Sequence, residues 1–184
     1  MLNSLVKKSF PGRALEAFRY LRYGQLKWDQ SLPLIRMISK EEGEFYSACA
    51  HQIRDMNGAM VDLGCWMGAT ACSLARGATA KKGNGSEKID RVYAFDRFIW
   101  ESWMNSQLPK VFCRYLPGES FLPEARRRVE FYHGAVELVR ADLKSHVWTG
   151  GPIKLLLVDA MKNREVARVI TMSFFPSLTE QSIL

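Results

Sequence analysis

The N-terminal part of the chain alternates apolar and polar residues at helical spacing. From Arg13 to Lys27 the apolar positions predict an amphipathic helix. Ser39 with Glu42 three residues later is typical of a capping box, which would open a second helix through Ile53. Asn57-Gly58 then breaks the pattern. We therefore expect residues 1–57 to form a helical cap.

Beyond the break, short apolar runs alternate with segments that can be helical. Each run is rich in β-branched or aromatic residues, which is typical of strands. Strands that alternate with helices predict βαβ units and a parallel sheet covered on both faces. Residues 58–184 should therefore form an α/β, Rossmann-like, doubly wound domain with strands at Ala59–Leu63, Arg91–Phe95, Val129–Tyr132 and Ile153–Val158.

The length and composition suit one soluble globular domain. The chain has 184 residues, of which 47% are hydrophobic and 24% charged. No apolar run reaches the roughly 18 residues that a membrane span needs, and no apolar segment of a secretory signal follows the basic N-terminus. Four cysteines stand at spacings that match no zinc site, so we expect small buried thiols in a reducing compartment, the cytoplasm.

The net charge of +7 leaves an anionic partner open. The basic residues are dispersed apart from three short runs, at Lys7-Lys8, Lys81-Lys82 and Arg126-Arg127-Arg128. Solvated surface is the simpler interpretation of each run. A nucleic-acid partner is therefore possible but not favoured.

The segment VDLGCWMGAT contains the most informative turn. A strand runs into Gly64 and Gly68, and a helix is expected from Ala69 to Ala78. Glycines let the backbone approach a ligand closely, and a helix N-terminus offers free N–H groups. Trp66 occupies the place of the middle glycine in the dinucleotide fingerprint, which disfavours a nicotinamide cofactor. A tight turn without any ligand is the alternative.

A second acid-bearing strand end supports ligand binding. The strand RVYAF ends at Asp96, where a carboxylate can accept two hydrogen bonds from a ribose diol. A solvated loop acid is the alternative. The insert KKGNGSEK, residues 81–88, accounts for the long separation between Asp96 and the glycine turn.

These motifs carry a resemblance. VDLGCWMGAT with YAFDRF resembles the class I S-adenosylmethionine-dependent methyltransferases, and is most similar to the macrocin and cephalosporin-type small-molecule O-methyltransferases. Their first motif is similar to V-E-x-G-V-W-x-G-G-S, with an aromatic residue where Trp66 stands. Their second motif, F-D-x-F, is matched by Phe95, Asp96 and Phe98. The resemblance extends from about Ala59 to the C-terminus.

The resemblance implies S-adenosylmethionine as the cofactor and assigns roles to matching residues. Asp62 would order the loop and reach the methionine amino group, Asp96 would hold the ribose, and Phe98 would border the adenine. The methionine part would be lined by Gly64, Cys65, Trp66 and Gly68.

The third predicted strand extends the adenine site. It would bring His133, Gly134 and Ala135 to the adenine edge. His133 can equally be a half-buried histidine at a strand end, so it is assigned no chemistry.

The resemblance also places the reaction at the end of the fourth strand. The family sequence there is similar to I-D-G-D, in which the first acid binds a divalent metal and the second is a candidate base. In V-D-A-M-K, Asp159 matches as the catalytic and Mg²⁺-binding acid, but Met161 replaces the second acid. Lys162 could act as the base if burial depressed its pKa. Asp159 could instead cap the next helix.

The acceptor is expected to be a hydroxyl of a small molecule, such as a sugar or secondary metabolite. RNA is a weaker candidate, and a nicotinamide-dependent oxidoreductase or a non-catalytic binding module are rival functions. An aromatic cluster could wall the acceptor pocket or simply pack helices: Phe98, Trp100, Trp103 and Met104.

The resemblance implies a seven-stranded core, of which the sequence predicts four strands and a possible fifth from Ser182. We therefore expect C-terminal strands to be missing. IKLLLV would then be left with an unpaired edge, and the chain by itself would be inactive or very weak in methyl transfer. A homo-oligomer is one possible assembly.

Overall fold

The computed structural model describes residues 37–79, 90–106, 115–132 and 134–184. Several expectations lie outside these ranges and stay predictions: the solvated run Lys7-Lys8, the helix from Arg13 to Lys27, the insert at residues 81–88, and the placement of Cys113 and His133.

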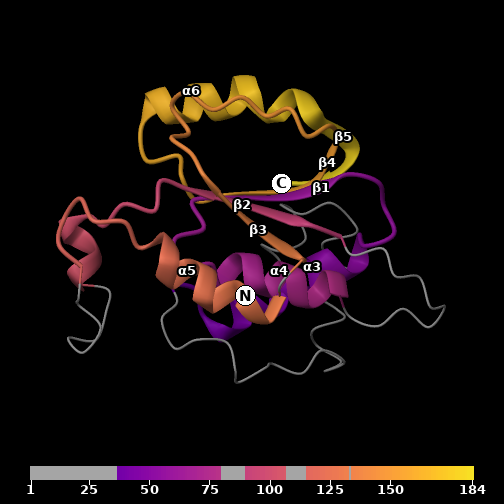
Figure 1. Cartoon of the computed structure of the whole chain (residues 1–184). Coiled ribbons are helices and arrows are strands. Elements are labelled where there is room, and N and C mark those ends of the chain that lie inside the picture. The colour runs from indigo at the N-terminus through magenta and orange to yellow at the C-terminus, as the bar shows by residue number, and fades with distance from the viewer. Residues whose placement is uncertain (1–36, 80–89, 107–114, 133) are drawn as a thin grey trace, which may run out of the picture.

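A five-stranded sheet forms the centre of the fold, with the order β3-β2-β1-β4-β5. Every neighbouring pair is parallel. Figure 1 shows β1 in the middle of this twisted sheet. The predicted Rossmann-like parallel sheet is thereby confirmed, with strands β1 Ala59–Leu63, β2 Val92–Asp96, β3 Val136–Arg140, β4 Ile153–Val158 and β5 Leu178–Ile183.

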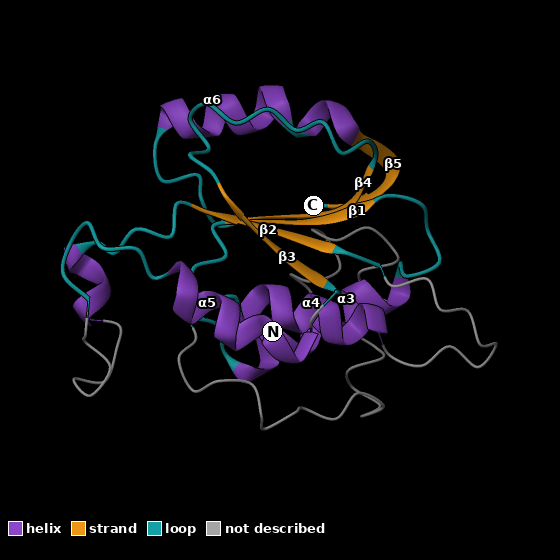
Figure 2. Cartoon of the chain, viewed as in Figure 1, coloured by secondary structure: helices purple, strands orange, loops and turns teal. Residues whose placement is uncertain are grey.

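Helices cover both faces of the sheet, as a doubly wound fold requires. Figures 1 and 2 show α6 on one side, and α3, α4 and α5 together on the other. The bounds are α3 Lys40–Gln52, α4 Ala69–Thr79, α5 Leu122–Val129 and α6 Arg164–Ser173. Short 3-10 helices are η1 Ser102–Ser106, η3 Glu130–Tyr132 and η4 Phe175–Ser177.

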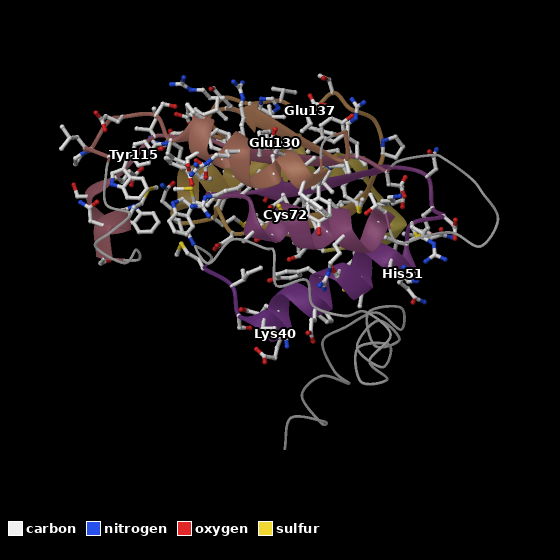
Figure 3. All side chains as sticks on the ribbon, turned by 60° about the horizontal axis from the view of Figure 1, so that its bottom comes forward. Lys40, His51, Cys72, Tyr115, Glu130 and Glu137 are labelled. Atoms are coloured by element: carbon white, nitrogen blue, oxygen red, sulfur yellow. The ribbon has the colours of Figure 1, made fainter. Side chains whose placement is uncertain are left out.

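The predicted capping box starts α3. The Ser39 side chain accepts a hydrogen bond from the Glu42 N–H, and the Glu42 carboxylate accepts one from the Ser39 N–H. The helix then packs against α4, where a side chain at Gly77 would overlap the Ser47 carbonyl. Figure 3 shows α3 between Lys40 and His51, next to Cys72 on α4.

The core has two parts because strand side chains alternate between the faces. Met60, Val92 and Ala94 are buried on the side of α3, α4 and α5. Val61 and Phe95 are buried on the side of α6, against Ile170 and Phe174 among others.

The third strand is not where the sequence predicted it. Val129–Tyr132 forms the end of α5 and the 3-10 helix η3, and β3 starts only at Val136. A short apolar run does not distinguish a strand from a helix end. Pro123 in the first turn favours the helix, and Gly134, with φ +84°, turns the chain before β3.

Strand β4 does not lie at an edge. It pairs with β1 on one side and β5 on the other, which corrects the expected unpaired edge at IKLLLV. The fifth strand begins at Leu178 rather than Ser182, directly after η4. In the part of the chain that the structure describes, no helix has both the length and the apolar character to cross a bilayer.

Candidate functional site

A cavity of about 600 Å³ opens at the carboxyl edge of the sheet. Residues that follow four parallel strands line it, which is where ligands bind in open α/β sheets. Segments before α3, in η1 and at the start of α6 add to its wall. The lining residues used below are Ile38, Gly64, Cys65, Trp66, Asp96, Trp103, Met104, Asp142, Leu143, Asp159 and Lys162.

The glycine turn after β1 is held by the end of β2. The N–H groups of Gly64 and Cys65 both donate to the Phe95 carbonyl, at 2.9 and 3.1 Å. Gly64 has φ +94°, and a Cβ there would lie 3.2 Å from the backbone carbon of Asp159. Only glycine fits this conformation and this contact without strain. The turn is therefore packed between the ends of β2 and β4.

Trp66 adopts a left-handed backbone conformation in the same turn, with φ +45°. Its N–H donates to Asp96 Oδ2 at 3.1 Å. The side chain is 7% exposed and lines the cavity, and its indole Nε1 has no hydrogen-bond partner among the described residues. The tryptophan is thus part of the cavity wall rather than of the solvent-facing surface.

Asp96 links the turn to the cavity. Its Oδ1 accepts a hydrogen bond from the Phe98 N–H at 2.7 Å, while Oδ2 accepts from Trp66. Each carboxylate oxygen can accept a further bond. Burial raises the pKa of Asp96, and the two backbone hydrogen bonds act in the opposite direction. The carboxyl group is therefore fixed in position and still able to receive hydroxyl donors from the cavity.

Asp62 lies beneath the turn with only 2% of its surface exposed. Its Oδ2 has no hydrogen-bond partner within the described residues. Burial, followed by the charges of Asp96 and Asp159, raises the pKa of Asp62 to about 7. The pKa of the Tyr46 hydroxyl on α3 is raised by burial and, to a smaller degree, by Glu42 and Asp62. A buried carboxyl group without a partner is costly, and a cationic ligand would relieve that cost.

Phe98 does not lie where the resemblance placed it. Its side chain is fully buried and packs edge-on against Phe121, at 5.6 Å between ring centroids, and it does not line the cavity. Trp100 is buried in the same cluster. Trp103 and Met104, in contrast, line the cavity. Two members of the predicted cluster therefore belong to the core, and the other two belong to the cavity wall.

Gly134 and Ala135 lie at the opposite edge of the sheet from Asp96. They precede β3, and the Ala135 carbonyl accepts a hydrogen bond from Val92 at the start of β2. The prediction that they border the adenine followed from the wrong position of the third strand. Residues after β3, including Asp142 and Leu143, line the cavity instead. The alternation in VELVR before Asp142 was the signal that would have found them.

Asp159 lies at the cavity rim with Lys162 beside it. The Lys162 Nζ is 2.6 Å from Asp159 Oδ1, and both side chains are about three-quarters exposed, at 74% and 75%. The burial required for Lys162 to act as a base is therefore missing. Met161, in place of the family's second acid, is 39% exposed.

The donor set at Asp159 does not fit Mg²⁺. In residues 37–79, 90–106, 115–132 and 134–184, no three His, Cys, Asp or Glu side chains come together as a metal site. Mg²⁺ prefers several oxygen ligands, and Asp159 offers one carboxylate already paired with an ammonium group.

Gly68 and the cysteines have structural environments. Gly68, with φ +83°, turns the chain into α4 and lies against Val129 rather than in the cavity. Cys49, Cys65 and Cys72 are free and buried, as expected, and burial raises the pKa of each. Cys113 is outside the described residues.

The basic run on α5 is only partly solvated. Arg127 is exposed. Arg128 has an 8% exposed side chain that pairs with Glu124 at 2.6 Å.

Comparisons with known proteins support the fold. No protein-family model and no curated protein match the chain. Among solved structures, the calicheamicin methyltransferase CalS11 matches with a TM-score of 0.55 and 16% identity, over 92% of this chain and 74% of that one. At this identity the match establishes the fold. The chain therefore has the Rossmann-like α/β fold of that methyltransferase.

Two weaker matches are also methyltransferase or cofactor-bound structures. The SAH-bound methyltransferase PaMTH1 of Podospora anserina has a TM-score of 0.49 and 15% identity, over 98% of this chain and 65% of that one. Cofactor-bound Rv0187 from MTB has a TM-score of 0.42 and 19% identity, over 84% and 57%. The chain thus spans 65% of the length of the Podospora protein.

Proposed function

We propose that this chain binds S-adenosylmethionine in the cavity at the carboxyl edge of the sheet and transfers its methyl group to a hydroxyl oxygen of a small molecule. The observation that supports this most directly is the pair of acids at the glycine turn. The Oδ2 of Asp62 is buried without a hydrogen-bond partner within the described residues, beneath the turn and outside the cavity lining, and Asp96 presents a fixed carboxyl group to the cavity. An ammonium group and a ribose diol on one ligand would satisfy both.

The roles of the residues follow from their positions. Asp96 accepts hydrogen bonds from the ribose hydroxyls, and Asp62 stabilises the methionine ammonium group from beneath the turn. The backbone of Gly64, Cys65 and Trp66 lines the methionine part. The proposed adenine contacts differ from those that the resemblance implied. Asp142 and Leu143, after β3, replace Phe98, Gly134 and Ala135, because Asp142 and Leu143 line the cavity and the other three residues do not.

Methyl transfer asks mainly for positioning. S-adenosylmethionine supplies an activated methyl group on a sulfonium. The chain has to hold the acceptor oxygen in line with that methyl and keep competing water out. Apolar side chains such as Ile38, Trp103 and Met104 line the cavity and can exclude water. Asp159, at the rim, is the candidate catalytic carboxylate that accepts the hydroxyl proton.

Calorimetric titration with S-adenosylhomocysteine tests the proposal. The parent protein should bind it, and Asp96→Ala should weaken binding by at least about tenfold because charge-assisted hydrogen bonds to the ribose are lost. Asp96→Asn, which retains one acceptor for the backbone, separates loss of ligand contacts from disorder of the turn. The matched control is Glu130→Ala, an acid on η3 that does not line this cavity.

The rival functions predict other outcomes. Binding of NAD but not S-adenosylhomocysteine, unaffected by Asp96→Ala, would favour an oxidoreductase. Affinity for RNA that falls steeply with salt would favour phosphate contacts and an RNA substrate. Binding of S-adenosylhomocysteine without methyl transfer to any of a panel of hydroxylated small molecules would favour a non-catalytic module. The cytoplasmic location and a homo-oligomeric state stay predictions.

A further inference from the structure

The end of β4 brings a lysine onto the acid that the resemblance assigned to a metal. The Asp159 N–H donates to the Leu63 carbonyl at 2.9 Å, which fixes the acid beside the glycine turn. The Lys162 N–H donates to the Ala160 carbonyl at 2.8 Å, so the chain bends back on itself. This bend places the Lys162 ammonium 2.6 Å from Asp159 Oδ1, and both side chains line the cavity.

The ion pair alone does not decide whether a metal binds. Two exposed charges attract each other only weakly in water, so a divalent cation with enough ligands could displace Lys162. The ligands are what the position lacks. The chain offers Met161 where a second carboxylate is expected, and a thioether is a poor ligand for Mg²⁺. The only positive charge held on Asp159 by the described residues is therefore the Lys162 ammonium.

We propose that Lys162 takes the place of the divalent cation, so that its ammonium group binds the acceptor oxygen and the site works without a metal. This inference rests on the proposed methyl transfer. An ammonium has three donors, of which one reaches Asp159. The other two can point at an acceptor oxygen in the cavity. A fixed positive charge there stabilises an oxygen that is losing its proton.

The transfer step balances without a metal. A lone pair of the acceptor oxygen forms the bond to the methyl carbon, and the carbon–sulfur bond breaks with its electrons moving to the sulfonium sulfur. The hydroxyl proton passes to the Asp159 carboxylate and then to water. Lys162 takes no part in this proton transfer and serves as a binding residue.

Titration with Mn²⁺, followed by its electron paramagnetic resonance signal, tests the inference without an acceptor. The parent protein should show no saturable binding. Met161→Asp combined with Lys162→Ala removes the ammonium and restores the second acid, and should bind Mn²⁺ at least about tenfold more tightly than the matched control Met161→Ala with Lys162→Ala, which has one carboxylate.

Two results would overturn the inference. The first is saturable Mn²⁺ binding to the parent protein that disappears in Asp159→Asn. The second is equal Mn²⁺ affinity in the two double variants. Titration with S-adenosylhomocysteine on the same samples keeps the questions apart, because its failure contradicts the proposed function, whereas the Mn²⁺ results bear only on whether a metal binds at Asp159.

Discussion

The burial of Asp62 destabilises the ligand-free protein. A carboxyl group with 2% exposure and no partner for Oδ2 within the described residues loses hydration without compensation. Its pKa of about 7 lies well above the ordinary value of 3.8, so it holds its proton more tightly in the folded protein. A bound cation would compensate the lost hydration of this carboxyl group. This suits a cofactor that carries an ammonium group.

The raised pKa of Asp62 predicts a pH-dependent stability. Between about pH 4 and 7 the folded protein retains a proton that the unfolded chain has lost, so the free energy of unfolding falls as the pH rises. Asp62→Asn removes this dependence. Relative to the parent, its free energy of unfolding should increase by about 2–3 kcal/mol from pH 5 to pH 8. Urea unfolding of the cofactor-free proteins measures this. A difference in the free energy of unfolding between variant and parent that stays constant with pH would contradict it. Asp142→Asn, at an exposed acid, is the control.

Strand β4 contains a buried charged residue, Lys154. Lys154 is 1% exposed although it stands in an otherwise apolar strand. Its ammonium pairs with Asp90 at 2.8 Å and donates to the carbonyls of Arg54 and Met56 at 3.4 and 3.1 Å. One side chain thus fastens β4 to the segment just before β2 and to the turn between α3 and β1.

Removing the ammonium should therefore be costly. Lys154→Met leaves Asp90 without its partner in the core, and we expect the free energy of unfolding to fall by about 3–5 kcal/mol. Adding Asp90→Asn to this variant should restore part of the loss, because no charge is then left buried. Lys40→Met breaks a partly exposed pair with Glu44 and should cost less than about 1 kcal/mol. Chemical denaturation compares the three, and equal losses for Lys154 and Lys40 would refute the assignment.

At the scale of the molecule, the cavity joins the ends of four strands of one sheet. A ligand that contacts all of them binds only the folded state. Saturation with S-adenosylhomocysteine at about 100 times its dissociation constant should stabilise the fold by about 2.7 kcal/mol, which corresponds to a rise in melting temperature of roughly 5–10 °C. Thermal melts with and without the ligand measure this. The same rise in Asp96→Ala would show that the ligand binds elsewhere.

The sequence alone predicted the elements whose signals are local. The capping box of Ser39 and Glu42, the bounds of β1 and β4, and the helix after the glycine turn all follow from spacing and residue type, and the structure has them there. The parallel sheet follows as well, since helices long enough to cross the sheet are the usual connections between parallel strands. Gly64 and Asp96 could be placed at one edge of that sheet for the same reason.

Tertiary structure decided what depends on contacts between distant segments. The run Val129–Tyr132 is apolar enough for a strand, but the helix begun at Leu122 continues through it, so β3 and its cavity residues lie further on. Phe98 resembles an adenine contact in sequence, yet its backbone turn at φ +53° directs the ring into the core. The ion pair of Asp159 with Lys162 and the isolation of Asp62 likewise depend on which groups the fold brings within a few ångströms, and spacing along the chain does not fix those distances.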